Sequence, residues 1–334
     1  RFVWAGNQIN LQRGQIHLSD PDDCYRDAPK DTLEDIIFRI ERGDKWQAVL
    51  REQFEEKHNW LYRVITSKSR SLFLRQRKIP KRDHALDIGA GWGQFSIPLA
   101  KTNQVCSLEP TPERLKFIRT VSRQEGIHDN MSFLGADYLD VEFQTKFDLI
   151  LCIGVLEWVG CFRKAIDPIA QQRTFLKKIK SDLKDGGRVI IGIENRVGLK
   201  YLLGVPDDHT GLSLVSCMRS DMAKKLHKEQ TGEELKCFTY TMREYEEMLA
   251  EAGFTQCLFF AAFPDYKLPE KIFPVHGKQC SLNEYLSDGN RIIEHNGRDG
   301  CPLTEQDKLN SIYSTLASKK VAHNFAPSFY IEAS

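Results

Sequence analysis

One stretch, His84–Gly93 (HALDIGAGWG), constrains the fold more than any other part of the chain. Residues 84–88 form an apolar run that favours a β-strand, and it ends in a turn with glycines at Gly89, Gly91 and Gly93. A helix-compatible segment, FSIPLAK, follows directly. A strand, a glycine turn and a helix start place backbone N–H groups around a ligand at the helix N-terminus. The sequence therefore predicts an α/β fold with a ligand site at this turn.

The next strand-like segment, QVCSLEP at 104–110, carries Glu109 about twenty residues beyond the first glycine, where an acid can accept hydrogen bonds from both ribose hydroxyls. A dinucleotide-binding turn needs a third glycine at the position that Gln94 occupies. The leading acid, Asp87, would repel a pyrophosphate but attract a sulfonium or an ammonium group. The turn therefore favours S-adenosylmethionine (SAM), and a dinucleotide or no ligand at all are the alternatives.

The length and net charge of the chain limit the fold and function classes that it can belong to. The chain has 334 residues, which suits one large α/β domain with additions. Its 47 Lys and Arg against 46 Asp and Glu leave a net charge of +1, so no overall field recruits nucleic acid or a membrane. Nothing resembles a signal peptide or a spanning helix, and the nine cysteines form no C-x-x-C pair. We expect reduced thiols, no zinc site and a cytoplasmic location. Since the chain begins with Arg1 and not Met, we expect it to be a piece of a longer protein.

The first part of the chain is predicted to be helical. Residues 1–30 are polar and irregular, with a turn cluster PDDCYRDAP, but apolar side chains recur at helical spacing from Asp31 to Arg77. The last of three helices, Trp60–Arg77, contains the polar insert TSKSRS, which is expected to bend it or to mark where it meets a ligand. We expect residues 1–80 to form an arm and a helical cap, and residues 81–334 the main domain.

Strand-like runs then alternate with helices, which predicts a parallel sheet with right-handed crossovers. Lys184–Gly187 is predicted as the turn before the fifth strand. We expect insertions at 194–238, after strand five, and at 264–322, between strands six and seven. The seven predicted strands are 84–88, 104–109, 131–134, 147–153, 188–193, 254–263 and 327–333.

LDIGAGWG, Glu109, Gly135-Ala136-Asp137, the strand and turn at 147–159 and DGGRVII together resemble the class I SAM-dependent methyltransferases over residues 84–263. The resemblance implies a Rossmann-like, seven-stranded, mostly parallel sheet flanked by helices, with strand seven antiparallel between strands five and six. It also implies an N-terminal helical lid over the cofactor. An acid at Asp137 would bind the adenine amino group, with a turn cap as the alternative. The implied cofactor-binding residues are Asp87, Gly89, Gly91, Gly93, Glu109, Asp137, Tyr138 and Gly154.

The segment ENRVGLKYLLGVPDDHTG at 194–211 narrows the resemblance. It is similar to bacterial methyltransferase domains found beside glycosyltransferases in proteins that modify surface polysaccharides and related glycans. This implies a sugar, glycan or related small molecule as acceptor, and a fused or associated catalytic domain. The family often has Glu-His where this chain has Glu157-Trp158, so no catalytic histidine is carried over to that position.

Methyl transfer to a hydroxyl requires an aligned acceptor, exclusion of water and removal of a proton. His209 is the candidate general base, because a neutral imidazole near pH 7 can take a proton, and Asp208 could orient it. Glu194 and Asn195 could hold the acceptor. For each of these side chains a purely structural role is the alternative. The candidate substrate-binding residues are Arg196 and Lys200, which suit a phosphate or carboxylate, together with Glu157 and Trp158.

Other readings remain open. Asp207, Asp208, His209 and Glu194 offer ligands for a Mg²⁺-type ion, but adjacent acids on a loop more often form turns, and no metal is predicted. The enzyme alternatives are a natural-product or small-acid methyltransferase, or a nucleic-acid methyltransferase that uses the basic stretch at 68–82. The alternative from another class is a non-catalytic SAM-binding module of a larger multidomain protein.

Overall fold

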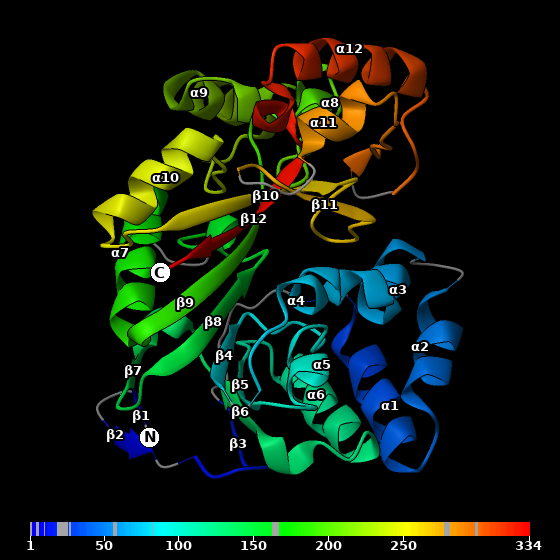
Figure 1. The fold of residues 1–334 in the computed structure, drawn as a ribbon. Coiled ribbons are helices and arrows are strands. Elements are labelled where there is room, and N and C mark those ends of the chain that lie inside the picture. The colour runs from blue at the N-terminus through cyan, green and yellow to red at the C-terminus, as the bar shows by residue number, and fades with distance from the viewer. Residues whose placement is uncertain are drawn as a thin grey trace. The chain divides into compact units, whose positions relative to one another are not determined.

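Figure 1 shows the fold in a computed structural model of the chain, which describes residues 2–4, 7–9, 11–18, 26, 28–55, 59–81, 83–161, 167–276, 281–297 and 300–334. Most of the PDDCYRDAP cluster lies outside the described residues. The chain divides into two compact units. Unit 1 comprises Arg1–Ile153 and Lys178–Val189, and unit 2 comprises Gly154–Lys177 and Ile190–Ser334. The expected division at residue 80 stays a prediction.

Unit 1 is built on parallel strands in the order β8-β4-β5-β6-β3. Their side chains are buried on both faces in β4 and β8, which explains the near-continuous apolar runs there. The turn-forming residues follow the carboxyl ends of β4 and β5, where ligands bind in open α/β sheets. The bounds are β3 Ile16–Leu18, β4 His84–Ile88, β5 Gln104–Leu108, β6 Met131–Gly135 and β8 Phe147–Ile153.

The prediction of an irregular segment over residues 1–30 is wrong. β3 pairs parallel with β6, and β1 (Phe2–Trp4) and β2 (Asn7–Ile9) form an antiparallel sheet with β7 (Val141–Phe143). Strands β1, β2 and β3 have three residues each, too few to show an alternating pattern. The partners of β1 in β7 and of β3 in β6 lie more than 100 residues downstream, so the neighbouring sequence carries no signal for these two pairings.

The helices of unit 1 pack around the glycine turn. Trp92 is buried between Phe54 and Phe117, with ring centroids 5.8 Å and 4.9 Å away. The predicted helix Trp60–Arg77 is broken, because the side chain of Ser67 accepts a hydrogen bond from the Ser69 N–H and starts a short 3₁₀ segment. The bounds are α1 Lys30–Glu41, α2 Trp46–Phe54, α3 Asn59–Thr66, α4 Leu72–Arg77, α5 Ser96–Leu99 and α6 Pro112–Gln124.

In unit 2 the strand order is β9-β12-β10-β11. As expected for the last strand, β12 (Ser328–Ala333) lies between β9 (Leu183–Glu194) and β10 (Cys257–Phe263), antiparallel to β10. β11 (Lys271–Pro274) comes from the proline-rich segment and forms an edge, the position in a sheet that tolerates proline. Among the described residues the main sheet has nine strands, so the predicted seven is wrong, and β3 and β11 are the two additions.

β9 also begins earlier than predicted, at Leu183, so the expected turn at 184–187 falls inside the strand. Gly186 keeps a left-handed φ of 74°, a local irregularity within it. None of the described helices is both long and apolar enough to cross a membrane. The seven described cysteines form no disulfide with one another, and Cys24 and Cys280 lie outside the described residues. The remaining helices are α7 Pro168–Asp182, α8 Leu199–Leu202, α9 Ser220–Thr231, α10 Met242–Glu251, α11 Leu282–Ser287 and α12 Gln306–Ser318.

Candidate functional site

The glycine turn of unit 1 has a backbone that side chains rarely allow. Gly89, Gly91 and Gly93 have φ values of 63°, 58° and 79°. A Cβ at Gly93 would lie 2.9 Å from the side chain of Ile97. Glu109, only 3% exposed, holds the turn in place, because its Oε2 accepts a hydrogen bond from the Gly91 N–H at 2.8 Å. Its Oε1 accepts from the backbone N–H of Thr111 at 3.0 Å.

Asp87 lies beneath this turn, buried to 2% exposure at the end of β4. The hydroxyl of Ser96 donates to Asp87 Oδ2 at 2.6 Å, and the hydroxyl of Ser107 donates to Ser96 Oγ at 2.8 Å. Burial raises the pKa of Asp87 to about 7, although the hydrogen bond from Ser96 opposes the shift. A cation bound beside Asp87 would favour its ionised form.

Asp137 and Tyr138 follow β6 at the same edge of the unit 1 sheet. The carboxylate of Asp137 is exposed and accepts a hydrogen bond from the Leu139 N–H at 2.9 Å, so it acts as a turn cap. The turn cap that the sequence left open is therefore present, and it does not remove the carboxylate from solvent. The hydroxyl of Tyr138 donates to Asp182 Oδ2 at 2.6 Å, which engages it within unit 1.

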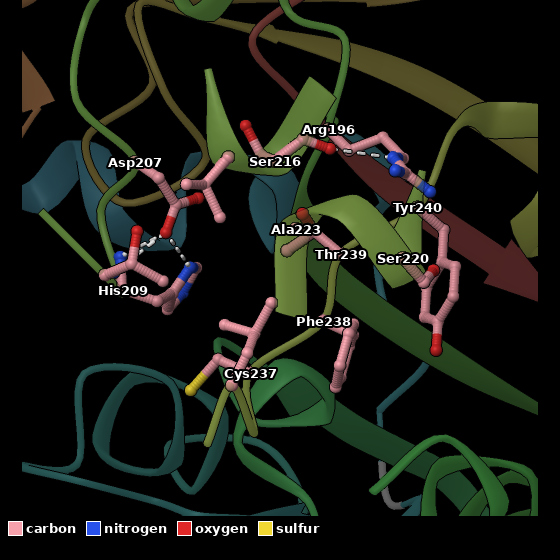
Figure 2. Close-up of a pocket in the computed structure, with 13 residues that line it drawn as sticks. Arg196, Asp207, His209, Ser216, Ser220, Ala223, Cys237, Phe238, Thr239 and Tyr240 are labelled. Carbon is pink, nitrogen blue, oxygen red and sulfur yellow. Dashed lines mark hydrogen bonds and ion pairs between the residues drawn. The ribbon is translucent and has the colours of Figure 1, made fainter. Parts of the chain in front are cut away.

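Unit 2 has a pocket of its own, of about 400 Å³ including the part open to solvent. Figure 2 shows Asp207 and His209 at one side of it, with the backbone and side chains of residues 237–240 along another. The wall is mixed, since polar groups alternate with apolar side chains such as Val215, Leu235 and Phe238.

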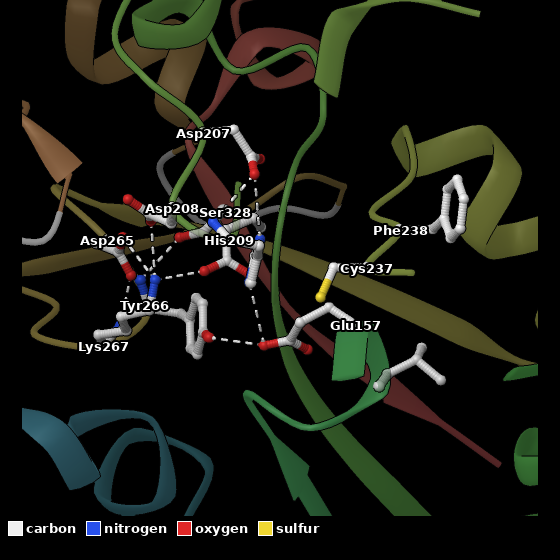
Figure 3. A network of polar contacts seen from close by, with 12 residues as sticks. Glu157, Asp207, Asp208, His209, Cys237, Phe238, Asp265, Tyr266, Lys267 and Ser328 are labelled. Carbon is white, nitrogen blue, oxygen red and sulfur yellow. Dashed lines mark hydrogen bonds and ion pairs between the residues drawn. The ribbon is translucent and has the colours of Figure 1, made fainter. Parts of the chain in front are cut away.

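Next to the pocket lies a group of buried charged side chains, the charged cluster, shown in Figure 3. It is assembled from four places in the sequence: the turn after β8, the end of β9, the segment from α8 to His209, and the loop after β10. The residues are thus up to 110 positions apart in the chain. The members are Glu157, Glu194, Lys200, Asp207, Asp208, His209, Asp265 and Lys267.

His209 is surrounded by carboxylates. Its Nε2 lies 3.7 Å from Glu157 Oε1 and 3.8 Å from Glu194 Oε2, and its Nδ1 lies 3.8 Å from Asp207 Oδ1. Burial alone would lower the pKa of His209, but the carboxylates of Glu194, Asp207 and Glu157 raise it well above its usual value. The ring of Trp158 packs edge-on against the imidazole at 5.2 Å. The surrounding carboxylates thus favour the protonated imidazole, whereas the general base that the sequence suggested is a neutral imidazole.

Asp207, and not Asp208, is the aspartate that contacts His209. Asp207 Oδ1 accepts the backbone N–H groups of His209 and Thr210, at 3.0 and 2.8 Å, which folds the loop so that the imidazole faces the same carboxylate. Asp208 points instead to Lys267 Nζ, at 2.9 Å, and to Lys200 Nζ, at 4.0 Å.

Lys267 is the functional candidate that the sequence did not reveal. Its Nζ donates to Glu194 Oε1 and to Asp208 Oδ2, and lies 3.8 Å from Asp265 Oδ2. Lys200 Nζ lies 3.7 Å from the same Asp265 oxygen and is 1% exposed, so Lys200 is a buried member of the cluster. One cue was present in the sequence, because Asp265-Tyr266-Lys267 directly follows a strand at the end where sites form, but no spacing rule links it to Glu194.

The other predicted residues are engaged in holding the fold of unit 2. Asn195 Nδ2 donates to the carbonyls of Asn324 and Ala326, both at 2.8 Å. Arg196 donates to carbonyls in the segment before α9, including that of Ser216 at 2.8 Å, and to Glu244 Oε1 at 3.3 Å. Gly154 has a φ of 70°, and a Cβ there would lie 2.9 Å from the hydroxyl of Tyr266. That hydroxyl in turn contacts Glu157 Oε1 at 3.4 Å.

Comparison with known families identifies the family of the chain that contains the glycine turn. A family described as "Methyltransferase domain" matches residues 79–253. The chain belongs to this methyltransferase family. The match spans β4 to the end of α10, and therefore includes the glycine turn and all of the charged cluster up to His209.

The methyltransferase also resembles curated proteins over part of its length. It is 28% identical over 134 residues to a ubiquinone biosynthesis O-methyltransferase of Xanthomonas axonopodis, which covers 40% of this chain and 52% of that protein. It is 27% identical over 139 residues to a probable fatty acid methyltransferase of Pseudomonas putida, covering 41% and 33%. The chain thus spans about half, or less, of the length of these relatives.

Solved structures of methyltransferases are similar as well. One is a SAM-dependent methyltransferase from Thermotoga maritima, described as a possible histamine N-methyltransferase, with a TM-score of 0.44 and 13% identity. The similarity covers 85% of this chain and 97% of that one. Another is a putative O-methyltransferase from Nostoc punctiforme, with a TM-score of 0.42 and 19% identity, covering 60% and 56%.

The cofactor of this methyltransferase is SAM, and the residues of unit 1 fit it. The left-handed glycines leave the turn without side chains, and the buried carboxylate of Glu109 stands at the end of β5 as an acceptor for ribose hydroxyls. Asp87 supplies the negative charge that suits a sulfonium and an ammonium group, and the exposed Asp137 suits the adenine amino group. When bound, SAM supplies an electrophilic methyl group. Each residue assignment stays a proposal.

Asp87 makes the stability of the methyltransferase depend on pH. Its folded pKa of about 7 lies above the value of about 3.9 in an unfolded chain. The contribution of Asp87 to the free energy of unfolding is therefore fully present below about pH 4 and is lost as the pH rises to about 7. Asp87→Asn keeps the oxygen that accepts from Ser96 and removes the buried charge. We expect it to be more stable than the unmodified protein at pH 8 by up to about 4 kcal/mol, and by much less at pH 5. Urea denaturation at both pH values measures the difference, and an equal gain at the two would contradict this explanation.

Proposed function

We propose that this protein transfers the methyl group of SAM to a hydroxyl oxygen of a small organic acceptor. The observation that supports this most directly is a pair of buried carboxylate oxygens, Glu157 Oε2 and Glu194 Oε2, that accept no hydrogen bond from any described residue. An unpaired buried acceptor costs about 1–3 kcal/mol, so a ligand that brings a donor gains that energy on binding. A hydroxyl group is such a donor, and these carboxylates can also take its proton.

The position of the two glutamates along the chain supports the same assignment. Glu157 follows β8, and β8 is the parallel neighbour of β4, whose carboxyl end carries the glycine turn. Glu194 is the last residue of β9. Residues that follow the carboxyl ends of parallel strands are the usual source of binding groups in an open α/β sheet.

The roles of the chain's own residues then follow. Glu157 and Glu194 orient the acceptor hydroxyl and accept its proton as its oxygen is methylated. His209, held by three carboxylates, keeps the two glutamates apart and their charges balanced. Its assignment as the general base stays a prediction, since the raised pKa of the imidazole favours the protonated form at pH 7. Trp158 shields one edge of the imidazole from water.

The finer nature of the acceptor is also proposed. The segment at 194–211 favours a hydroxyl on a sugar or glycan-like molecule, whereas the name of the Xanthomonas relative points to O-methylation in ubiquinone biosynthesis. The mixed polar and apolar wall of the unit 2 pocket suits either class. A panel of hydroxylated sugars, phenols and fatty acids, each incubated with SAM, separates them. We expect release of S-adenosylhomocysteine together with a methyl ether that mass spectrometry identifies. Turnover with amines or carboxylic acids but with no hydroxyl compound would exclude the proposal.

The role of His209 has its own test. We expect His209→Ala to bind SAM with unchanged affinity, because the residues that fit SAM lie elsewhere in the chain, and to slow turnover at saturating substrate by about 100-fold or more. His227→Ala, a histidine on α9 outside the charged cluster, is the matched control and should leave turnover unchanged. Calorimetry with SAM and steady-state kinetics measure the two quantities. Normal turnover in His209→Ala across the pH range would remove His209 from the site.

A further inference from the structure

We propose that Glu157, Glu194 and His209 bind one divalent transition-metal ion, of the Mn²⁺ or Zn²⁺ type. The inference rests on the proposed function, because the ion would lie at the carboxylates that take the acceptor hydroxyl. It differs from the Mg²⁺-type site considered from the sequence in its ligands. Glu157 replaces the two aspartates, of which Asp208 points to the lysines and Asp207 to the opposite nitrogen of the imidazole.

The three side chains bring one donor atom each to a common place. These three atoms all lie within 4.8 Å of one another. His209 Nε2 stands 3.7 Å from Glu157 Oε1 and 3.8 Å from Glu194 Oε2, which is too long for a hydrogen bond. Atoms that each bind one ion at about 2.0–2.2 Å stand about 3–3.6 Å apart. The two distances from His209 Nε2 therefore need to shorten by a few tenths of an ångström, and the separation of the two glutamate oxygens, which is within 4.8 Å, by up to about 1 Å, to form a coordination site.

A second observation points to a missing ligand at the same place. Among the described residues, Glu157 Oε2 and Glu194 Oε2 have no hydrogen-bond partner, and each side chain is at most 2% exposed. The unpaired oxygen of Glu194 is the one near His209, whereas the Glu157 oxygen nearest to His209 is Oε1. The other oxygen of Glu194 is held by Lys267, which leaves Oε2 facing His209. Figure 3 shows Glu157 and His209 pointing toward each other from opposite segments. Water is excluded from both oxygens, so an ion would satisfy them at no cost of dehydrating the glutamates.

The charge balance of the cluster favours a cation on the Glu157 side. Five carboxyl groups there face two lysines and His209, and the imidazole of His209 would give up its proton to bind the ion through Nε2. Lys200 and Lys267 both lie on the side of Asp208 and Asp265. Within the described part of the chain, neither lysine comes within 4.0 Å of Glu157, whose charged neighbour is His209. A divalent ion between these two residues offsets the excess negative charge where the lysines do not reach it.

The donor set indicates the kind of metal. One imidazole nitrogen with two carboxylate oxygens suits Mn²⁺, Fe²⁺ or Zn²⁺, whereas Ca²⁺ and Mg²⁺ prefer oxygen ligands alone. Three protein ligands leave at least one coordination position for an exchangeable group. An acceptor hydroxyl in that position would pass its proton to the oxygen of Glu157 that does not hold the ion, and the ion would stabilise the resulting alkoxide.

The test uses the whole chain, stripped with EDTA, dialysed and titrated with MnCl₂. Electron paramagnetic resonance of free Mn²⁺ and calorimetry count the bound ions. We expect one site per chain, with ZnCl₂ displacing Mn²⁺ from it. Glu157→Gln and His209→Gln should each weaken the site by about 100-fold or more. Glu294→Gln should bind as the unmodified protein does. Glu294 is the matched control, a fully buried acid with an unpaired oxygen of its own that is hydrogen-bonded to Tyr313 and lies outside the triad.

The two substituted ligands come from separate segments, so circular dichroism shows whether at least one variant folds and reports on the site. Binding that persists in both folded variants, or no stoichiometric binding at all, would overturn the inference. The titration needs neither SAM nor acceptor, which keeps it distinct from the proposed function. Full methylation of a hydroxyl acceptor in the presence of EDTA would show that the reaction needs no metal ion, and it would leave the methyltransferase assignment intact. Specific Mn²⁺ binding without methylation of any hydroxyl compound would support the metal site and contradict the proposed function.

Discussion

Glu109→Ala is expected to weaken the binding of SAM and of S-adenosylhomocysteine by about 100-fold or more. A hydrogen bond to a charged group contributes about 1.5–3 kcal/mol, and 1.4 kcal/mol corresponds to a tenfold change in affinity. Glu109 offers two oxygens to the ribose hydroxyls, and the same oxygens hold the backbone N–H groups of Gly91 and Thr111. Its removal therefore deletes ligand contacts and loosens the glycine turn together. Calorimetric titration with each nucleotide measures the change.

Two further variants separate these contributions. Glu109→Gln keeps one acceptor oxygen for the turn but loses the negative charge, so we expect a dissociation constant between those of the alanine variant and the unmodified protein. Glu142→Ala removes an exposed glutamate from β7 of the same unit and should leave affinity unchanged. An unaltered dissociation constant in Glu109→Ala would mean that the ribose is held by other groups, and the assignment of the nucleotide site at this turn would fail.

The sequence was sufficient to predict the strand, glycine turn and helix here because their signals are local. The strand, the three glycines and Ser96 lie within thirteen residues, and the carboxyl ends of β4 and β5 must meet because the two strands pair in parallel register. An acid at the end of β5 therefore reaches the turn by connectivity alone. The one feature that local pattern did not reveal is that the acid is already occupied by the turn's own N–H groups.

The sequence revealed only part of the charged cluster, because its contacts are not local. Glu194, Asp207, Asp208 and His209 lie in one segment and could be singled out, but their contacts depend on a loop more than fifty residues downstream. Lys267, in the loop after β10, reaches Glu194 at the end of β9 although β12 lies between these two strands, a contact that a strand pattern does not encode. Asp207 faces the imidazole, and Asp208 does not, because the backbone N–H groups of the turn bind Asp207. The sequence does not specify this turn geometry.

Lys267 is the side chain on which the cluster depends most. It stands between Glu194, Asp208 and Asp265, whereas Lys200 contacts only the two aspartates, at 4.0 Å from Asp208 and 3.7 Å from Asp265. Burying a carboxylate is costly unless a counter-charge or a hydrogen bond compensates it. The same arrangement that aims Glu194 Oε2 at His209 thus requires a cation at Glu194 Oε1. Stability and the geometry of the proposed site are linked through this one ammonium group.

We therefore expect Lys267→Met to lower the free energy of unfolding by about 3–5 kcal/mol, the usual cost of leaving a buried charge without its partner. Urea denaturation at pH 7 in EDTA measures the loss without compensation by a metal ion. Lys225→Met makes the same change at an exposed lysine paired with Glu229 and should cost less than about 0.5 kcal/mol. Adding Asp208→Asn to Lys267→Met removes one of the stranded charges and should restore part of the stability, because the two residues are in direct contact. Losses that simply add in the double variant would show that the pair does not interact, and the charged cluster would then be held by packing rather than by its ion pairs.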